Sequence, residues 1–112
     1  MVRSGSRSQK ADQGSPDLAT IKAELGAFLP DLRRRYPIAY LGIFGSWVQG
    51  EQRPDSDVDI LVEFDGAVDL LDIAGLEADL EDRLGRRVDL AQRNLLKPRL
   101  RPLILAEAQA AG

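Results

Sequence analysis

The amino-acid sequence predicts an α+β domain, in which a small mixed and mostly antiparallel sheet of about three to four strands is flanked by helices. Two observations lead to this fold class. Apolar residues recur at helical spacing in two longer segments, 17–35 and 68–85. Three shorter segments, 38–44, 57–64 and 86–92, are apolar or alternate between apolar and polar residues, as strands do. Because the two patterns alternate along the chain, we expect them to share one core.

Each predicted helix has an apolar stripe and a residue that ends it. The apolar positions of the first helix are Leu18, Ile21, Leu25, Phe28, Leu29 and Leu32. Pro37 is expected to end this helix, because the residue before a proline disfavours the helical conformation. The apolar positions of the second helix are Leu70, Ile73, Leu76, Leu80 and Leu84. Gly85 is expected to end it, because glycine readily adopts the left-handed conformation at a helix terminus.

The strand over 57–64 has two different faces. Val58, Ile60 and Val62 point to one face. The other face carries Asp57, Asp59, Leu61 and Glu63. Acidic side chains on one face repel each other, so we expect a positively charged partner between them.

The last segment, 94–112, predicts one or two short helical pieces, because Pro98 and Pro102 interrupt it. Its apolar residues are Leu100, Leu103, Ile104 and Leu105. They either complete the core or form part of a partner surface, and the sequence leaves both interpretations open.

Length and composition restrict the function classes. The 112 residues predict one domain over 17–112, after a polar segment 1–16 that we interpret as a disordered tail. The chain has no cysteine and no histidine, which excludes thiolate zinc sites and Ser-His-Asp chemistry. Any metal must be bound by oxygen atoms, which favours magnesium, manganese or calcium.

Charge and hydropathy indicate location and partners. The net charge is −3, and the first 16 residues contribute +2, so the remaining chain carries −5. An acidic surface is a poor match for nucleic acid, so we expect no direct nucleic-acid partner, whereas a nucleotide bound through a metal is compatible. No apolar run approaches the roughly 18 residues that span a bilayer. We therefore expect a cytoplasmic protein without membrane contact.

Aspartates are the first candidates for chemistry. Asp57 and Asp59 share a strand face about 6.5–7 Å apart, so their carboxylates can converge on one or two divalent ions. An exposed polar edge is the alternative, but apolar residues flank both aspartates, and aspartate is a poor strand former. Asp89 lies alone among apolar residues of the third strand. It joins the same cluster if that strand pairs beside 57–64.

A glycine–serine turn, Gly45-Ser46, follows the first strand. Glycine lets the backbone approach a ligand closely, and serine with free N–H groups binds phosphate oxygens. An ordinary turn is the alternative. Together with the aspartates, however, "FGSWVQGEQRPDSDVDILVEF" (44–64) resembles the G-S-x(n)-D-x-D signature of the nucleotidyltransferase superfamily that includes DNA polymerase beta. It is most similar to the minimal nucleotidyltransferase (MNT) proteins of that superfamily.

The resemblance covers about residues 18–108, because "LEADLEDRLGRRVDLAQRNLLKPRLRPLILAEA" is similar to that family's helix, third-carboxylate strand and C-terminal segment. It implies a nucleotidyltransferase fold. The implied nucleotide-binding residues are Gly45, Ser46 and Gln49. The implied catalytic and metal-binding residues are Asp57, Asp59 and Asp89, which would hold two Mg²⁺ ions. ATP would be the substrate.

The resemblance also implies a function. Members of the family are often antitoxins that transfer AMP from ATP to a tyrosine of a HEPN-domain ribonuclease toxin. We therefore expect a hetero-oligomer with a HEPN toxin, with a homodimer as the alternative for the chain alone. One departure from the family pattern matters, since Val48 and Gln49 replace the usual alanine and arginine of the turn.

Gln49 can donate a hydrogen bond but brings no charge. This motivates a second hypothesis, an antitoxin with a weak or inactive site that neutralises its toxin by binding alone. A third hypothesis, transfer to a small molecule or an RNA end, is disfavoured by the acidic body. Trp47, in the same turn, is interpreted as a packing residue, with a partner surface as the alternative.

Overall fold

The computed structural model describes residues 17–53 and 55–111. The predicted tail, 1–16, lies outside this part of the chain. In order, the elements are α1 (Leu18–Arg35), β1 (Ile38–Phe44), α2 (Ser46–Gln49), β2 (Val58–Phe64), α3 (Leu70–Leu84), β3 (Val88–Gln92), a 3-10 turn η1 (Arg93–Leu95), α4 (Arg101–Glu107) and β4 (Gln109–Ala110).

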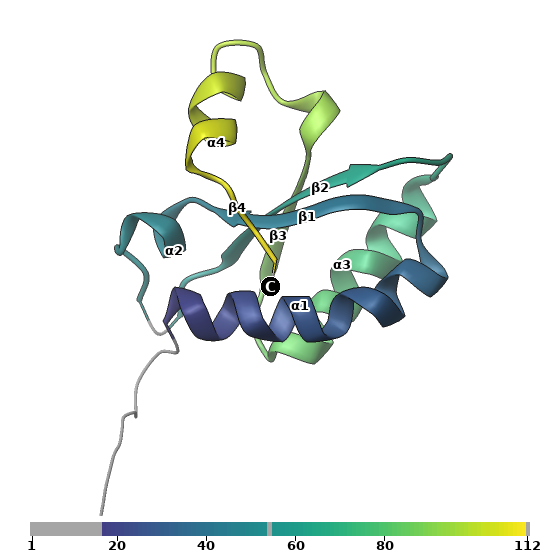
Figure 1. Cartoon of the computed structure of the whole chain (residues 1–112), viewed down its shortest axis with the longest axis horizontal. Coiled ribbons are helices and arrows are strands. Elements are labelled where there is room, and N and C mark those ends of the chain that lie inside the picture. Colours follow the sequence, from purple (N-terminus) through teal and green to yellow (C-terminus); the bar gives the residue numbers. More distant parts are fainter. Residues whose placement is uncertain (1–16, 54, 112) are drawn as a thin grey trace, which may run out of the picture.

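The strands form one mixed sheet in the order β3-β2-β1-β4. β1 is antiparallel to both β2 and β4, whereas β2 and β3 are parallel and are joined through α3. Figure 1 shows α1 and α3 on one side of the sheet and α4 on the other. The predicted α+β class and mixed sheet are confirmed.

The core lies between the sheet and the layer formed by α1 and α3. The strand face predicted to be apolar is fully buried here, since Val58, Ile60 and Val62 have no exposed surface. The helices contribute Ile21, Leu25, Leu32, Leu76 and Leu80. Leu61 is also buried, although it points to the face of the aspartates. The centre of β2 is therefore covered on both faces.

Helix ends are set by capping residues. Asp17, which was expected inside the first helix, is its N-cap and accepts a hydrogen bond from the Thr20 backbone N–H at 2.9 Å. Asp69 and Asp72 form a reciprocal capping box at the start of α3, so this helix begins at Leu70 rather than at residue 68. Gly85 ends α3 in the left-handed conformation, with φ 67°, as predicted.

Leu70 corrects the predicted apolar stripe of α3. It was expected to face the core, but it is 83% exposed. It is the first residue of the helix, and the buried residues of α3, Leu76 and Leu80, come from its later turns. Leu70 has the spacing of the apolar stripe, but the first turn of α3 contributes no buried residue.

The C-terminal segment contains a strand that the sequence analysis missed. β4 pairs Ala110 with Gly42 and Gln109 with Ile43 on β1. Two residues are too few to show a strand periodicity. None of the residues Arg101–Glu107 in α4 is buried, and Leu103 is 67% exposed. Of the two interpretations left open for this helix, completion of the core is therefore wrong.

No helix in the described part of the chain combines the length and apolar character required to cross a membrane.

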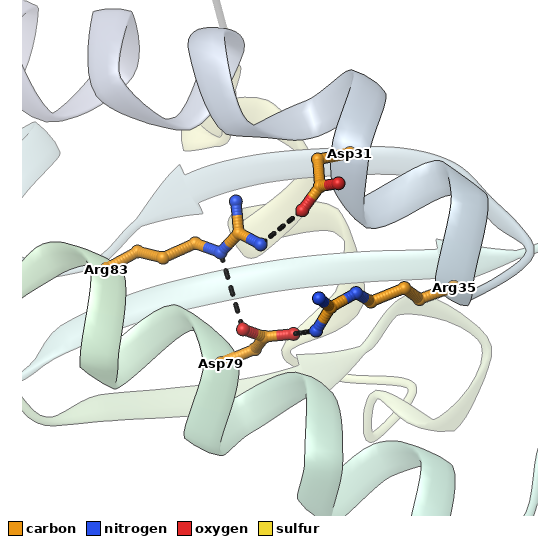
Figure 2. A network of polar contacts seen from close by, with 4 residues as sticks. All are labelled: Asp31, Arg35, Asp79 and Arg83. Atoms are coloured by element: carbon orange, nitrogen blue, oxygen red, sulfur yellow. Dashed lines mark hydrogen bonds and ion pairs between the residues drawn. The ribbon is translucent and has the colours of Figure 1, made fainter.

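A network of charged side chains joins α1 to α3 (Figure 2). The Arg83 guanidinium lies between two carboxylates, donating to Asp31 and, at 3.3 Å, to Asp79. Arg35 also donates to Asp79 at 3.0 Å. The hydrogen bond from Arg83 lowers the pKa of Asp31, so the carboxylate stays charged. Arg83 also lies over the Phe28 ring, 5.5 Å from its centroid.

Replacing Arg83 with methionine is expected to lower the free energy of unfolding by about 1 kcal/mol, because two hydrogen-bonded ion pairs are lost. Urea unfolding monitored by circular dichroism measures this change. Arg99→Met serves as the control, since Arg99 is an exposed residue between η1 and α4 and belongs to neither α1 nor α3. Equal losses in the two variants would show that the network contributes nothing.

Candidate active site

The turn after β1 is the first component of the site. Gly45 has φ 79° and ψ −147°, a backbone conformation that is essentially restricted to glycine. Its carbonyl accepts hydrogen bonds from Val48 and Gln49 and so starts the single turn of α2. A Cβ atom on Gly45 would lie 2.1 Å from Oδ2 of Asp59. The glycine therefore permits both the turn and the close approach of the aspartate.

The sheet brings the predicted aspartates together. Phe44, the last residue of β1, is the register partner of Asp59 on β2. On the other side, Asp59 is the register partner of Asp89 on β3. Asp57 lies two residues before Asp59, at the entry to β2. Asp59 thus lies between the Gly45 turn and Asp89, as the sequence analysis expected if β2 and β3 were neighbours.

The buried side chain of Trp47 stabilises this arrangement. It is only 1% exposed, which confirms the interpretation as a packing residue. The indole N–H donates to the backbone carbonyl of Asp57 at 3.1 Å. The Arg86 guanidinium lies 5.1 Å from the centroid of the ring. Trp47 therefore ties the turn after β1 to the start of β2.

Negative charge accumulates at Asp59. Burial, followed by the charges of Asp89, Asp57 and Glu107, raises the pKa of Asp59 to about 6. Arg87 partly compensates, with its Nε 3.8 Å from Oδ1 of Asp57, but its side chain is 84% exposed. The site therefore favours a bound cation or a proton on Asp59.

The donors present fit a hard divalent cation. Asp57, Asp59 and Asp89 offer only carboxylate oxygens, which are the preferred ligands of Mg²⁺. The repulsion at Asp59 is the kind of energetic penalty that such an ion relieves. Within residues 17–53 and 55–111, no three acidic side chains are placed so that they could hold a metal ion as they stand. The carboxylates would have to turn toward an ion on binding it.

One residue of this site was missed by the sequence analysis. Glu107, the last residue of α4, accepts a hydrogen bond from the Gly45 backbone N–H at 2.6 Å, with its Oε1. Its Oε2 accepts from Nε2 of Gln49 at 3.1 Å. Glu107 lies 62 positions away from Gly45, so no local motif could have identified it.

The chain matches a known family over most of its length. The nucleotidyltransferase domain family covers residues 25–111. The chain is 43% identical over 90 residues to the protein adenylyltransferase MntA of Thermococcus cleftensis, which covers 80% of this chain and 91% of the relative. A solved structure described as a candidate minimal nucleotidyltransferase is 41% identical, with a TM-score of 0.72 over 87% of this chain and 98% of that one.

A more distant match has the same fold. It is a chain from the structure of a tri-AMPylated Shewanella oneidensis HEPN toxin in complex with MNT antitoxin, with 19% identity and a TM-score of 0.60 over 84% of this chain and 71% of that one.

These matches establish that the chain belongs to the nucleotidyltransferase family. The predicted resemblance to the MNT proteins is confirmed, and so is the prediction of an enzyme of the nucleotidyltransferase class.

Replacing Asp59 with asparagine is expected to stabilise the metal-free protein at pH 7, by about 1 kcal/mol once solvent screening is allowed for. Folding raises the pKa of Asp59 from 3.8 to about 6, so the folded state binds the proton more tightly. This contribution to the free energy of unfolding is therefore present at low pH and is lost as the pH rises from about 4 to about 6.

Urea unfolding of the wild type and of Asp59→Asn in EDTA, at pH 4.5 and at pH 7, measures this difference. Asp82→Asn, at an exposed position of α3, is the control. A gain in stability that is equal at pH 4.5 and at pH 7 would contradict the assignment of charge repulsion.

Replacing Gly45 with alanine is expected to destabilise the protein by at least about 2 kcal/mol more than replacing Gly50. Gly50, with φ 76° and ψ 19°, is in the left-handed region that other residues sometimes adopt, whereas Gly45, with φ 79° and ψ −147°, is not. A Cβ on Gly50 meets nothing within 4 Å, whereas one on Gly45 meets Asp59. Thermal unfolding of Gly45→Ala and Gly50→Ala compares them directly, and equal losses would show that neither the backbone conformation of Gly45 nor its contact with Asp59 matters for stability.

Proposed function

We propose that this protein is a Mg²⁺-dependent nucleotidyltransferase that acts as an antitoxin and transfers AMP from ATP to a tyrosine of a partner HEPN-family toxin. The observation that carries the proposal is the position of Asp59 between the Gly45 turn and Asp89. Strand pairing brings the Gly45 turn, which we propose binds phosphate, and the carboxylates of Asp59 and Asp89 to one end of the sheet. Because ATP is the proposed substrate, the cytoplasm is the proposed location.

Each predicted residue has a role in this proposal. Asp57, Asp59 and Asp89 would hold two Mg²⁺ ions, which would neutralise charge on the triphosphate. Gly45 and Ser46 would bind its phosphate oxygens. Gln49 would donate a further hydrogen bond through its side-chain amide. The cluster is negatively charged and the substrate is too, so metal-free ATP is expected to bind poorly.

The reaction is an in-line displacement at the α-phosphorus of ATP. The tyrosine oxygen forms a bond to this phosphorus, the bond to the β-phosphate oxygen breaks, and pyrophosphate leaves. The phenol proton passes to a carboxylate, for which Asp89 is our choice, since it is exposed at the edge of the cluster. The protein contributes mainly by positioning the substrate and neutralising charge.

The partner is the least direct part of the proposal. Support comes from the relatives, because the Thermococcus protein is described as a protein adenylyltransferase and the Shewanella structure contains an AMPylated HEPN toxin with its MNT antitoxin. We propose a hetero-oligomer with such a toxin, with a homodimer as the alternative for the chain alone.

A second candidate function is neutralisation by binding alone. Gln49 favours it, because this residue lacks the charge of the usual arginine and its amide is already bonded to Glu107. In that case the site would be weak or inactive, and the toxin would be blocked by the surface of the antitoxin.

The double variant Asp57→Asn/Asp59→Asn is expected to lose AMP transfer to the toxin by at least about 1,000-fold, because ligands of both metal ions are removed. Transfer of radiolabelled AMP from ATP to the co-purified toxin measures it. The matched control is Asp65→Asn/Asp82→Asn, which removes two exposed aspartates outside the site and should leave transfer unchanged.

The same variants separate the two functions. Neutralisation of the toxin in growing cells should fail for Asp57→Asn/Asp59→Asn if AMP transfer is the mechanism, even though the toxin still co-purifies with it. Retained neutralisation with no transfer would favour binding alone. Transfer that persists in this variant would refute the proposed site.

A further inference from the structure

Glu107 accepts hydrogen bonds from two of the groups that the turn after β1 offers to an anion. The Gly45 backbone N–H donates to one carboxylate oxygen at 2.6 Å, and the Gln49 amide donates to the other at 3.1 Å. Charge-assisted hydrogen bonds of this kind are stronger than neutral ones. The turn that our proposed function assigns to nucleotide phosphate is therefore bonded to an anion of the chain itself.

Glu107 also adds to the charge repulsion at the site. Its charge is one of those that raise the pKa of Asp59, and Asp57 and Asp89 contribute in the same direction. A fourth carboxylate beside three aspartates adds to the repulsion between negative charges, and the phosphates of a nucleotide would meet the same repulsion. Glu107 therefore opposes the phosphates by occupying two of their donors, and it adds negative charge beside the proposed metal ligands.

The segment that carries Glu107 is weakly attached. None of the residues Arg101–Glu107 is buried. β4 follows after one residue and is paired with β1 through two residue pairs. Three hydrogen bonds add to this attachment, from Lys22 to Gln109 at 3.0 Å, from the Ala111 N–H to the Leu41 carbonyl at 2.9 Å, and from Arg101 to the Arg93 carbonyl at 2.7 Å. Figure 1 shows α4 standing away from the layer of α1 and α3. The Glu107 side chain can therefore turn away from Gly45 and Gln49 without disturbing a buried residue of α4.

We propose that Glu107 is an internal competitor for the nucleotide, so that a phosphate of ATP must displace its carboxylate from Gly45 and Gln49 in order to bind. This inference rests on the proposed function, because it takes the Gly45 turn as the phosphate site. It also gives Gln49 a role that an arginine would not fill equally well. An arginine would bind Glu107 by a full ion pair, whereas the neutral amide releases it more readily.

The apparent affinity for nucleotide then depends on how often the carboxylate leaves the turn. If Glu107 occupies it about nine-tenths of the time, the apparent Kd is about tenfold higher than that of the open site. Replacing Glu107 with alanine removes the competitor and should lower the Kd for a non-hydrolysable ATP analogue with Mg²⁺ about tenfold. Glu107→Gln keeps the size and one acceptor but not the charge, so its Kd should fall between the two.

Isothermal titration calorimetry on the full chain measures these constants, after circular dichroism has shown that each variant is folded. Glu51→Gln is the matched control, because it removes one negative charge from an exposed residue just after the same turn. Its Kd should stay within about twofold of the wild type, which would exclude a general effect of net charge on ATP.

The outcomes separate this inference from the proposed function. Tighter binding by Glu107→Ala, with Glu51→Gln unchanged, supports the internal competitor. Binding by the wild type that becomes weaker or stays equal in Glu107→Ala overturns it, and leaves the nucleotide site in place. If neither the wild type nor any variant binds the ATP analogue, the nucleotide site itself is refuted, and the inference with it. The same conclusion follows if Asp57→Asn/Asp59→Asn binds the analogue as tightly as the wild type does.

Discussion

Repulsion between carboxylates at one end of the sheet is the constraint on which the rest of this structure depends. β2 places Asp59 between a glycine turn and Asp89, and Asp57 lies two residues before it. The burial and charges of this cluster raise the pKa of Asp59 to about 6. Strongly shifted pKa values of this kind cluster at functional sites, where a bound ligand relieves the repulsion. Among the described carboxylates of this cluster, an ion pair is found at Asp57 alone, so packing and backbone contacts hold the other carboxylates in place.

The support for the cluster comes from packing and from the backbone. Trp47 is buried and donates to the backbone carbonyl of Asp57, which leaves the carboxylate of that residue available. Gly45 lacks the Cβ that would collide with Asp59. Behind them, Val58 and Ile60 are fully buried against the helical layer. The same strand thus supplies the core on one face and the proposed chemistry on the other, and the site inherits its rigidity from the core.

The C-terminal segment has the opposite character. α4 buries none of its residues and β4 contributes two paired residues, yet Glu107 reaches the centre of the site. A well-packed strand that carries Asp59 therefore meets a C-terminal segment whose helix has no buried residue and which carries the proposed competing carboxylate. Low local stability is common in segments that must move when a ligand binds. The exposed residue Leu103 lies in the same C-terminal segment.

The sequence by itself determined the helices, three of the four strands and the candidate aspartates, because periodicity, capping residues and short motifs are local properties. The G-S and D-x-D pattern also carried the resemblance to the nucleotidyltransferase family, which the comparisons confirmed. Only the tertiary structure decided that Asp89 lies beside Asp59, that Leu70 is exposed, and that Glu107 occupies the Gly45 turn. These three features depend on strand order and on contacts between residues far apart in the chain, and such contacts leave no local pattern in the sequence.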